Sequence, residues 1–87
     1  MTESYKIFFK RSVQKDLAKL PRQELQKILL RVEALATCPR PPDVVKLSGH
    51  ELYRVRQGRY RIVYSIEDGI LQVWVIKIAH RKDVYRL

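Results

Sequence analysis

Cysteine is almost absent from this sequence. Cys38 is the only one, and a lone cysteine supplies neither a disulfide within the chain nor the set of thiolates that binds structural zinc. We therefore expect a free structural thiol, which is typical of proteins kept in a reducing compartment.

Long apolar segments are absent as well. The longest uninterrupted apolar run, residues 73–76, falls far short of the roughly 18–20 residues that cross a membrane. Residues 1–10 lack the apolar stretch and the small-residue cleavage site of a secretory signal. Together these absences predict a cytoplasmic protein with no membrane-spanning part.

Acidic residues are scarce. There are 9 of them against 18 basic residues, which leaves a formal net charge of +9. Such a balance favours polyanionic partners, namely nucleic acid, the ribosome, an acidic protein or an anionic membrane surface. The 87 residues, 46% of them hydrophobic, are enough for one small core, so we expect a single domain spanning residues 1–87.

Several kinds of chemical motif are missing too. The sequence has no carboxylate cluster for magnesium, no paired histidine and cysteine spacing for zinc, and no glycine-rich phosphate loop. We therefore expect no metal and no cofactor. If the protein is an enzyme, basic and phenolic side chains must carry its chemistry.

The pattern in the first half of the chain predicts a strand followed by a helical hairpin. Residues 5–10 are aromatic-rich and predict a strand. Ser12 is placed to cap a helix that starts at Val13, and Pro21 fits the first turn of a second helix. Residues at helical spacing form the apolar stripe of that second helix: Leu25, Ile28, Leu29, Val32, Leu35 and Ala36. Residues 37–43, with three prolines, predict a loop.

The second half changes to the period of a strand. Residues 52–56, 59–66 and 70–78 predict three antiparallel strands, with tight turns at residues 57–58 and 67–69. The last strand is apolar on both faces, which indicates a central position. The predicted fold is α+β, with an N-terminal strand and helical hairpin packed on a mainly antiparallel twisted sheet. A short C-terminal segment, residues 80–87, adds a helical turn or extends the last strand.

Alternation gathers arginines on one side of this sheet. Tyr60 and Ile62 must face the helices, so Arg61 faces away, and in the paired strand Arg54 and Arg56 do the same. Three like charges on neighbouring strands repel one another. The arrangement favours a bound anion, because guanidinium groups match phosphate oxygens. For any single arginine, a merely solvated basic face is the simpler interpretation.

The C-terminal segment contributes further candidates. If it folds over the sheet, Arg81 and Tyr85 reach the arginines, and Tyr85 offers a ring for stacking on a base. His80 has a side chain that transfers protons near neutral pH. Taken alone, Tyr85 is more often a peripheral packing residue and His80 a surface histidine.

Three blocks of the sequence, read together, resemble a known family. They are residues 46–49 (KLSG), 52–64 (LYRVRQGRYRIVY) and 76–86 (IKIAHRKDVYR). They resemble the RelE/ParE superfamily of toxins from toxin–antitoxin modules, and the RelE branch in particular. The resemblance extends over essentially the whole chain and implies a RelE-like fold.

The resemblance also implies an activity, which is metal-free cleavage of mRNA in the ribosomal A site through attack by a 2′-hydroxyl. It places catalytic roles on Arg54, Arg56, Arg61, Arg81 and Tyr85. Arg56 and Arg61 would hold the non-bridging phosphate oxygens, Arg81 would stabilise the leaving oxygen, Arg54 would position the phosphate and Tyr85 would stack on the nucleotide. Lys46, Arg59 and Lys82 lie in the same blocks and are expected to bind RNA.

The sequence departs from the RelE pattern at one point. Well-described members carry lysines where this chain has Arg54 and Arg56, and arginine is a poor base. His80 is therefore the candidate proton carrier, and Tyr85 is a weaker one. The implied partners are the ribosome, mRNA and a RelB-type antitoxin, in a hetero-oligomeric complex that binds operator DNA through the antitoxin.

Two other functions remain open from the sequence. A ParE-like inhibitor of DNA gyrase would share the fold without cutting RNA, although the retained arginines and Tyr85 argue against it. A catalytically silent module that binds RNA or the ribosome would also use the basic face.

Overall fold

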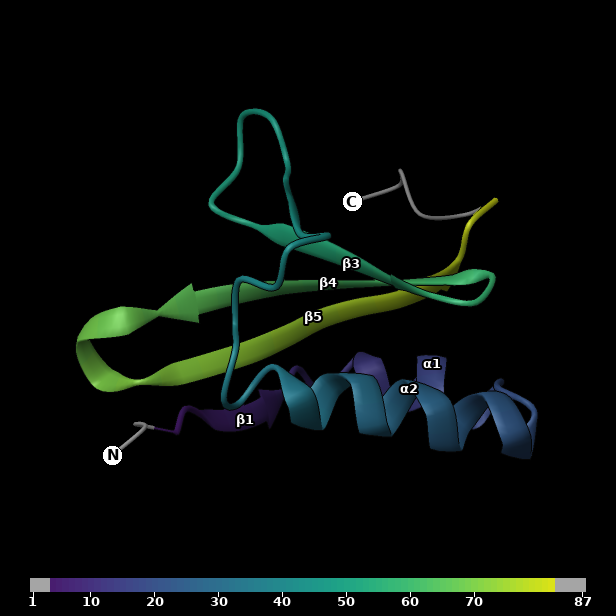
Figure 1. Ribbon diagram of the computed structural model, residues 1–87. Coiled ribbons are helices and arrows are strands. Elements are labelled where there is room, and N and C mark those ends of the chain that lie inside the picture. Colours follow the sequence, from purple (N-terminus) through teal and green to yellow (C-terminus); the bar gives the residue numbers. More distant parts are fainter. Residues whose placement is uncertain (1–3, 83–87) are drawn as a thin grey trace.

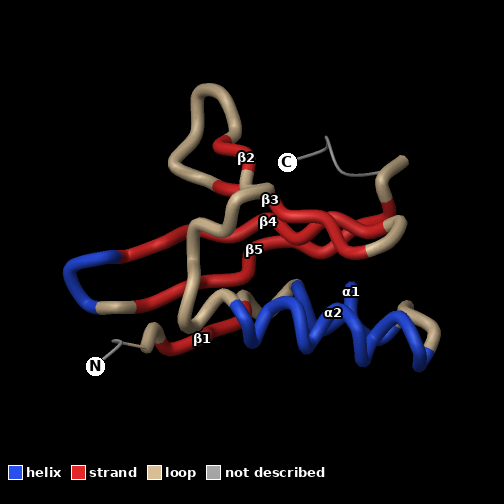
Figure 2. The backbone as a smooth tube through the Cα atoms, in the orientation of Figure 1, coloured by secondary structure: helices blue, strands red, loops and turns tan. Residues whose placement is uncertain are grey.

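Two helices lie on one side of a five-stranded sheet in the computed structural model, which describes residues 4–82 (Figures 1 and 2). The elements in chain order are β1 (Lys6–Phe9), α1 (Val13–Ala18), α2 (Arg22–Ala34), β2 (Val45–Lys46), β3 (Tyr53–Gln57), β4 (Tyr60–Glu67), the 3₁₀ turn η1 (Asp68–Ile70) and β5 (Gln72–His80). The predicted α+β architecture is confirmed. The predicted C-terminal segment beyond residue 82 lies outside the described residues.

The sheet has the strand order β1-β5-β4-β3-β2. β1 runs parallel to β5, and the other pairs are antiparallel. β5 is therefore paired on both sides, as its apolar sequence predicts. The last strand begins and ends two residues later than predicted, because η1 takes up residues 68–70. The sequence pattern does not predict β2, which has only two residues and follows a proline-rich loop.

The β3–β4 hairpin closes through a two-residue turn, Gly58 and Arg59, between the paired Gln57 and Tyr60. Gly58 has a φ of +61°, as required at the first position of the tight turn that fits the twist of a hairpin. A side chain other than glycine would be strained there. The turn fixes the register that sets Val55 opposite Ile62, and both are buried.

A β-bulge interrupts the pairing of β4 with β5. Val63 pairs with Lys77 while Tyr64 pairs with Val75, so Ile76 is left over on β5. An extra residue of this kind reverses the alternation of faces along the strand that carries it. Val75 and Ile78 consequently both face the core, although they are three residues apart. The bulge decides which face each later residue of β5 occupies.

The core lies between the helices and one face of the sheet. It is a cluster of buried side chains from both helices and from β3, β4 and β5, together with Leu35 at the end of α2: Val13, Ile28, Val32, Leu35, Val55, Ile62, Tyr64, Val73, Val75 and Ile78. The stripe predicted for α2 is buried at Ile28, Val32 and Leu35. The prediction is wrong at Leu29, which is 40% exposed. Leu29 lies at the edge of the stripe and faces a shallow groove beside α1 instead of the sheet.

α1 covers an open edge of β5. β1 pairs with β5 only as far as Val75, so among residues 4–82 no strand lies along the outer edge of β5 beyond that point. Asp16 on α1 accepts a hydrogen bond from the Ile78 backbone N–H at 3.2 Å and lies 3.4 Å from Lys77 Nζ. This satisfies an edge group that would otherwise be left unpaired. It also fixes α1 beside the end of β5.

α1 begins at the predicted residue, and α2 begins one residue later than predicted. Ser12 lies at the N-cap of α1, but its side chain makes no capping hydrogen bond. Pro21 lies at the N-cap of α2, one residue before the predicted first turn. Within residues 4–82, no helix has the length and apolar character needed to cross a membrane.

Candidate functional site

The β3–β4 hairpin places three arginines on the sheet face that points away from the helices. Arg56 and Arg61 are direct partners across the two strands, and Arg54 lies opposite Val63. Their strand neighbours Val55 and Ile62 face the core, so alternation directs all three arginines the other way. The shared face is therefore as predicted, and we call Arg54, Arg56 and Arg61 the arginine face.

The exposure of Arg61 differs from the expectation. A solvent-facing side chain was expected, but Arg61 is only 8% exposed, whereas Arg56 is exposed. Arg61 Nη1 donates a hydrogen bond to the Arg81 carbonyl at 3.2 Å, and the Arg81 N–H donates to the Arg59 carbonyl at 2.8 Å. Alternation gives the face on which a side chain lies but not what covers it. Arg81 thus adjoins the arginine face through its backbone, and its own side chain is exposed.

His80 lies on the other side of the sheet. It pairs with Tyr60, and the next pair in the ladder that shares their face, Ile62 with Ile78, belongs to the core. The two rings meet edge to face with centroids 5.6 Å apart. Simple alternation from Val75 would have put His80 on the arginine face, but the bulge at Ile76 reverses it. His80, the candidate proton carrier, therefore lies on the opposite sheet face from Arg54, Arg56 and Arg61.

The residues expected to bind RNA are spread around the sheet. Lys46 pairs with Tyr53, whose side chain packs against the core, so Lys46 lies on the opposite face from the arginines, 3.5 Å from the carboxylate of Glu51. Arg59 is exposed in the hairpin turn and Lys82 is exposed just after β5. Tyr85 lies outside the described residues.

Several groups with shifted pKa values belong to a structural network at the far end of β4 from the hairpin turn. Asp68 accepts hydrogen bonds from Arg40 at 2.9 and 3.1 Å and from the Tyr5 hydroxyl at 2.7 Å. These contacts lower the pKa of Asp68 to about 2. Burial raises the pKa of Tyr64, whose hydroxyl donates to the Pro39 carbonyl at 2.6 Å. This network ties the proline-rich loop to the sheet.

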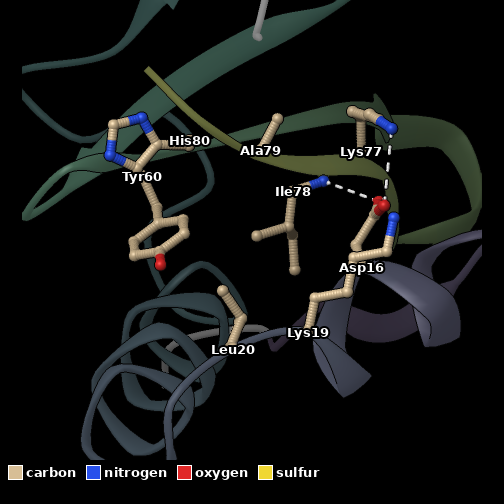
Figure 3. Close-up of a pocket in the computed structure, with 8 residues that line it drawn as sticks. All are labelled: Asp16, Lys19, Leu20, Tyr60, Lys77, Ile78, Ala79 and His80. Carbon is tan, nitrogen blue, oxygen red and sulfur yellow. Dashed lines mark hydrogen bonds and ion pairs between the residues drawn. The ribbon is translucent and has the colours of Figure 1, made fainter. Parts of the chain in front are cut away.

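The helical side of the sheet holds a pocket that the sequence patterns do not indicate. It has a volume of about 460 Å³ and lies between the end of α1 and the last residues of β5 (Figure 3). Tyr60 and His80 line one end of it, Ile78 its middle, and Asp16 with Lys77 the other end. The one sequence signal is the pairing of an aromatic residue with the histidine at the ends of β4 and β5. Within residues 4–82, no group of three or more histidine, cysteine and acidic side chains is placed to hold a metal ion.

Comparisons with known proteins identify relatives of this chain. A family model described as the ParE toxin of the type II toxin–antitoxin system parDE matches residues 7–85. The chain is 38% identical over 80 residues to the putative toxin RelE1 of Methanocaldococcus jannaschii, and the alignment covers 85% of this chain and 87% of that protein. It is 34% identical over 87 residues to toxin RelG of Mycobacterium tuberculosis, covering 94% and 97% of the two chains.

Solved structures show the same fold. The archaeal RelE–RelB complex from Pyrococcus horikoshii contains a chain that superposes with a TM-score of 0.81 at 31% identity, covering 97% of this chain and 100% of that one. The toxin–antitoxin complex RelBE2 from Mycobacterium tuberculosis gives a TM-score of 0.81 at 26% identity, covering 90% and 99%. The predicted RelE-like fold is confirmed.

Proposed function

This chain belongs to the RelE/ParE family of toxins of type II toxin–antitoxin systems, and we propose that it is an mRNA endonuclease that cuts messages on the ribosome. The proposed place of action is the cytoplasm, where messages are translated. The observation that carries the proposal is the direct pairing of Arg56 with Arg61 on the face opposite the helices. Guanidinium groups gathered on one face of a sheet match the oxygens of a phosphate group.

The proposed reaction is a transfer within the RNA. The ribose 2′-oxygen forms a bond to the adjacent phosphorus while the bond from phosphorus to the 5′-oxygen breaks. The 2′-hydroxyl loses a proton and the 5′-oxygen gains one, which leaves a 2′,3′-cyclic phosphate and a 5′-hydroxyl end. Negative charge grows on the non-bridging oxygens as the new bond forms, and donors fixed in place stabilise that charge.

The arginines have distinct proposed roles in this reaction. Arg56 and Arg61 bind the non-bridging oxygens, and Arg54 positions the phosphate. Arg81, whose backbone adjoins Arg59 and Arg61, stabilises the leaving oxygen. Tyr85 stacks on the nucleotide. The ribosome holds the RNA bent, with attacking and leaving oxygens in line, and such alignment supplies much of the rate enhancement.

We leave His80 out of the proton transfer. Its ring lies across the sheet from the arginine face and its Nδ1 accepts the Lys82 N–H at 3.3 Å. Arginine stays protonated at any pH a protein meets, so the charge stabilisation does not change between pH 6 and 8. Replacement of His80 by glutamine is expected to leave the pH profile of cleavage unchanged in shape. A profile that loses one limb in His80→Gln would restore the histidine as base.

Purified ribosomes translating a defined message provide the test. Arg56→Ala and Arg81→Ala remove side chains that are exposed and leave the core untouched. Each is expected to lower the cleavage rate by about 10²–10³-fold, the usual cost of one oxyanion donor. Lys6→Ala, which removes an exposed lysine from β1, is the matched control and should cut at the rate of the unchanged chain. Undiminished cutting in both arginine variants would remove the scheme.

We also propose a RelB-type antitoxin as the controlling partner, in a hetero-oligomeric complex that binds operator DNA through the antitoxin. The supporting feature is a groove between α1 and α2 with apolar walls, formed chiefly by Phe9, Leu17, Leu25 and Leu29. It suits the apolar side of an amphipathic helix, and the net charge of +9 suits acidic residues on its other side.

Neighbouring leucines give a matched test of that groove. Leu29 lines it, whereas Leu30 is 66% exposed and does not. Leu29→Arg is expected to abolish co-purification with the antitoxin encoded beside the toxin, and Leu30→Arg to preserve it. Equal retention of the antitoxin by both variants would place the docking surface elsewhere.

A ParE-like gyrase inhibitor is the second candidate, because the matching family model is described as the ParE toxin. It predicts loss of DNA supercoiling by purified gyrase and no cut in translated messages. The RNase predicts the reverse. Toxicity with neither effect would indicate a silent module that binds RNA or the ribosome.

A further inference from the structure

Two hollows adjoin each other on the helical side of the sheet, away from the arginine face. The first, of about 460 Å³, lies between α1 and the end of β5 (Figure 3). The second, of about 500 Å³, lies between the start of α2 and the β3–β4 turn. Both have the size of ligand sites, about 300–1,000 Å³. They share Tyr60 and His80, and we call the combined surface the ring groove.

The rings of Tyr60 and His80 form the wall common to the two hollows. Their centroids are 5.6 Å apart with an interplanar angle of 81°, and the Tyr60 hydroxyl points from the sheet towards the helices, on the side of Leu20 (Figure 3). The Lys82 N–H donates to His80 Nδ1, so the neutral ring carries its proton on Nε2, which is then a donor. The wall therefore offers both aromatic surface and hydrogen-bonding groups.

Cations dominate the rest of the ring groove. Lys19 and Lys77 line the first hollow, and Lys27 and Arg59 line the second. Asp16 is occupied by Lys77 and by the Ile78 N–H, which leaves Glu24 to oppose three cations. Aromatic rings flanked by lysine and arginine are what single-stranded RNA binds, through stacked bases and backbone phosphates.

We infer that the ring groove is a second RNA-binding site, which takes a nucleotide outside the scissile position. This inference rests on the proposed action on RNA. His80 and Arg81 are consecutive, and the Gly58–Arg59 turn ends the sheet beside them. An RNA strand held by the arginine face can therefore pass around the end of β4 and β5 into the groove. The nucleotide belongs either to the message or to ribosomal RNA.

The groove suits RNA better than it suits an amphipathic protein helix. Such a helix requires an apolar surface, and the chain provides one between α1 and α2, lined by Leu17, Leu25 and Leu29. The ring groove instead presents charged side chains on both sides of its aromatic wall. A helix seated there would desolvate several lysines without an apolar gain.

Binding of an uncleavable RNA tests the inference directly. The probe is a 12-nucleotide 2′-O-methyl oligoribonucleotide, which has no 2′-hydroxyl to attack, and it is titrated onto the full chain. His80→Leu removes the ring edge and is expected to weaken binding about tenfold, as loss of one stacked base does. His80→Gln serves as the second variant should the leucine disturb folding. Lys19→Gln is expected to reduce the salt dependence by about one phosphate contact.

Lys6→Gln is the control for net charge, because it removes an exposed lysine that lies on β1 and does not line the groove. It should bind the probe within about twofold of the unchanged chain. A second arm repeats the titrations with message-free ribosomes. If the His80 and Lys19 variants bind only the oligonucleotide more weakly, the bound nucleotide belongs to the message. If they bind only the ribosomes more weakly, it belongs to ribosomal RNA.

Unchanged binding in both arms for the His80 and Lys19 variants would overturn the inference. A glutamate-rich peptide is titrated in parallel. If the variants weaken binding of this peptide and leave RNA binding unchanged, the inference is also overturned, because the groove would then be a protein site. Cleavage of a translated message by the unchanged chain is read in parallel. If the unchanged chain does not cleave the message, the proposed nuclease function is contradicted and the binding results are unaffected. If it cleaves normally but the variants bind RNA as the unchanged chain does, only the inference about the ring groove is contradicted.

Discussion

Replacing Arg56 by glutamine should move stability and activity in opposite directions. Arg56 is exposed and directly opposite Arg61 in the β3–β4 ladder. In the free protein the two guanidinium groups repel one another, so removing one charge relieves the sheet. In the proposed reaction the same charge stabilises the transition state, so its removal slows cleavage.

The size of the stability gain follows from the register. Cross-strand partners hold their Cβ atoms about 4.5–5.5 Å apart, and the long side chains splay to roughly 6–10 Å between charges. Two unit charges at that separation repel by about 0.4–0.7 kcal/mol in water, and by more here because Arg61 is largely buried. Salt screens such a partly buried pair less than an exposed one, for which the Debye length is about 10 Å at 0.1 M. Arg56→Gln should therefore gain at least a few tenths of a kcal/mol at low salt and less at 1 M.

Urea unfolding at low and high salt measures this term, and cleavage on translating ribosomes measures the other. Lys6→Gln is the control, since it changes net charge equally without an arginine opposite it. The expected outcome is a larger low-salt gain for Arg56→Gln than for Lys6→Gln, together with cleavage slowed by about 10²–10³-fold. A variant that is less stable at low salt and cuts normally would refute the reasoning and make Arg56 a structural residue.

Three further outcomes concern the fold. Tyr64→Phe removes the hydroxyl that donates to Pro39 and leaves that carbonyl without its partner, so unfolding in urea should show a loss of about 1–3 kcal/mol; a loss below 0.5 kcal/mol would contradict it. Ile28→Ala opens a cavity in the fully buried core and should cost about 2–5 kcal/mol, and a smaller loss would mean that the helices collapse onto the gap. Arg40 and Tyr5 lower the pKa of Asp68 from 3.8 to about 2, so its stabilisation is complete above the unfolded value and is lost as pH falls through about 2. Acid titration of stability should show Asp68→Asn converging on the unchanged chain across that window, and parallel curves would contradict the assignment.

The hairpin that carries the arginines could be predicted from the sequence because its signals are local. Alternation along β3 and β4, with a glycine turn between them, fixes which residues oppose one another. The pairing of Arg56 with Arg61 follows from that register. The apolar character of β5 likewise indicated a strand with neighbours on both sides, which its partners β1 and β4 confirm.

The position of His80 could not be predicted, because it depends on a single extra residue. Ile76 is left unpaired at the bulge, and no glycine or turn residue marks it in the sequence. Simple alternation then gives the wrong face for every later residue of β5. The low exposure of Arg61 was missed for a different reason, since it depends on contact with Arg81, twenty residues away in the sequence.

The central claim is that the arginine face breaks RNA through attack by the message's own 2′-hydroxyl. Its most direct test is to map the 5′ ends that the protein creates on a translated message, and then to repeat the reaction with one 2′-deoxynucleotide at the mapped position. The account predicts a cut in the all-ribose message that disappears when that single hydroxyl is removed. A cut that persists in the deoxy-substituted message, or no cut in either, would contradict it.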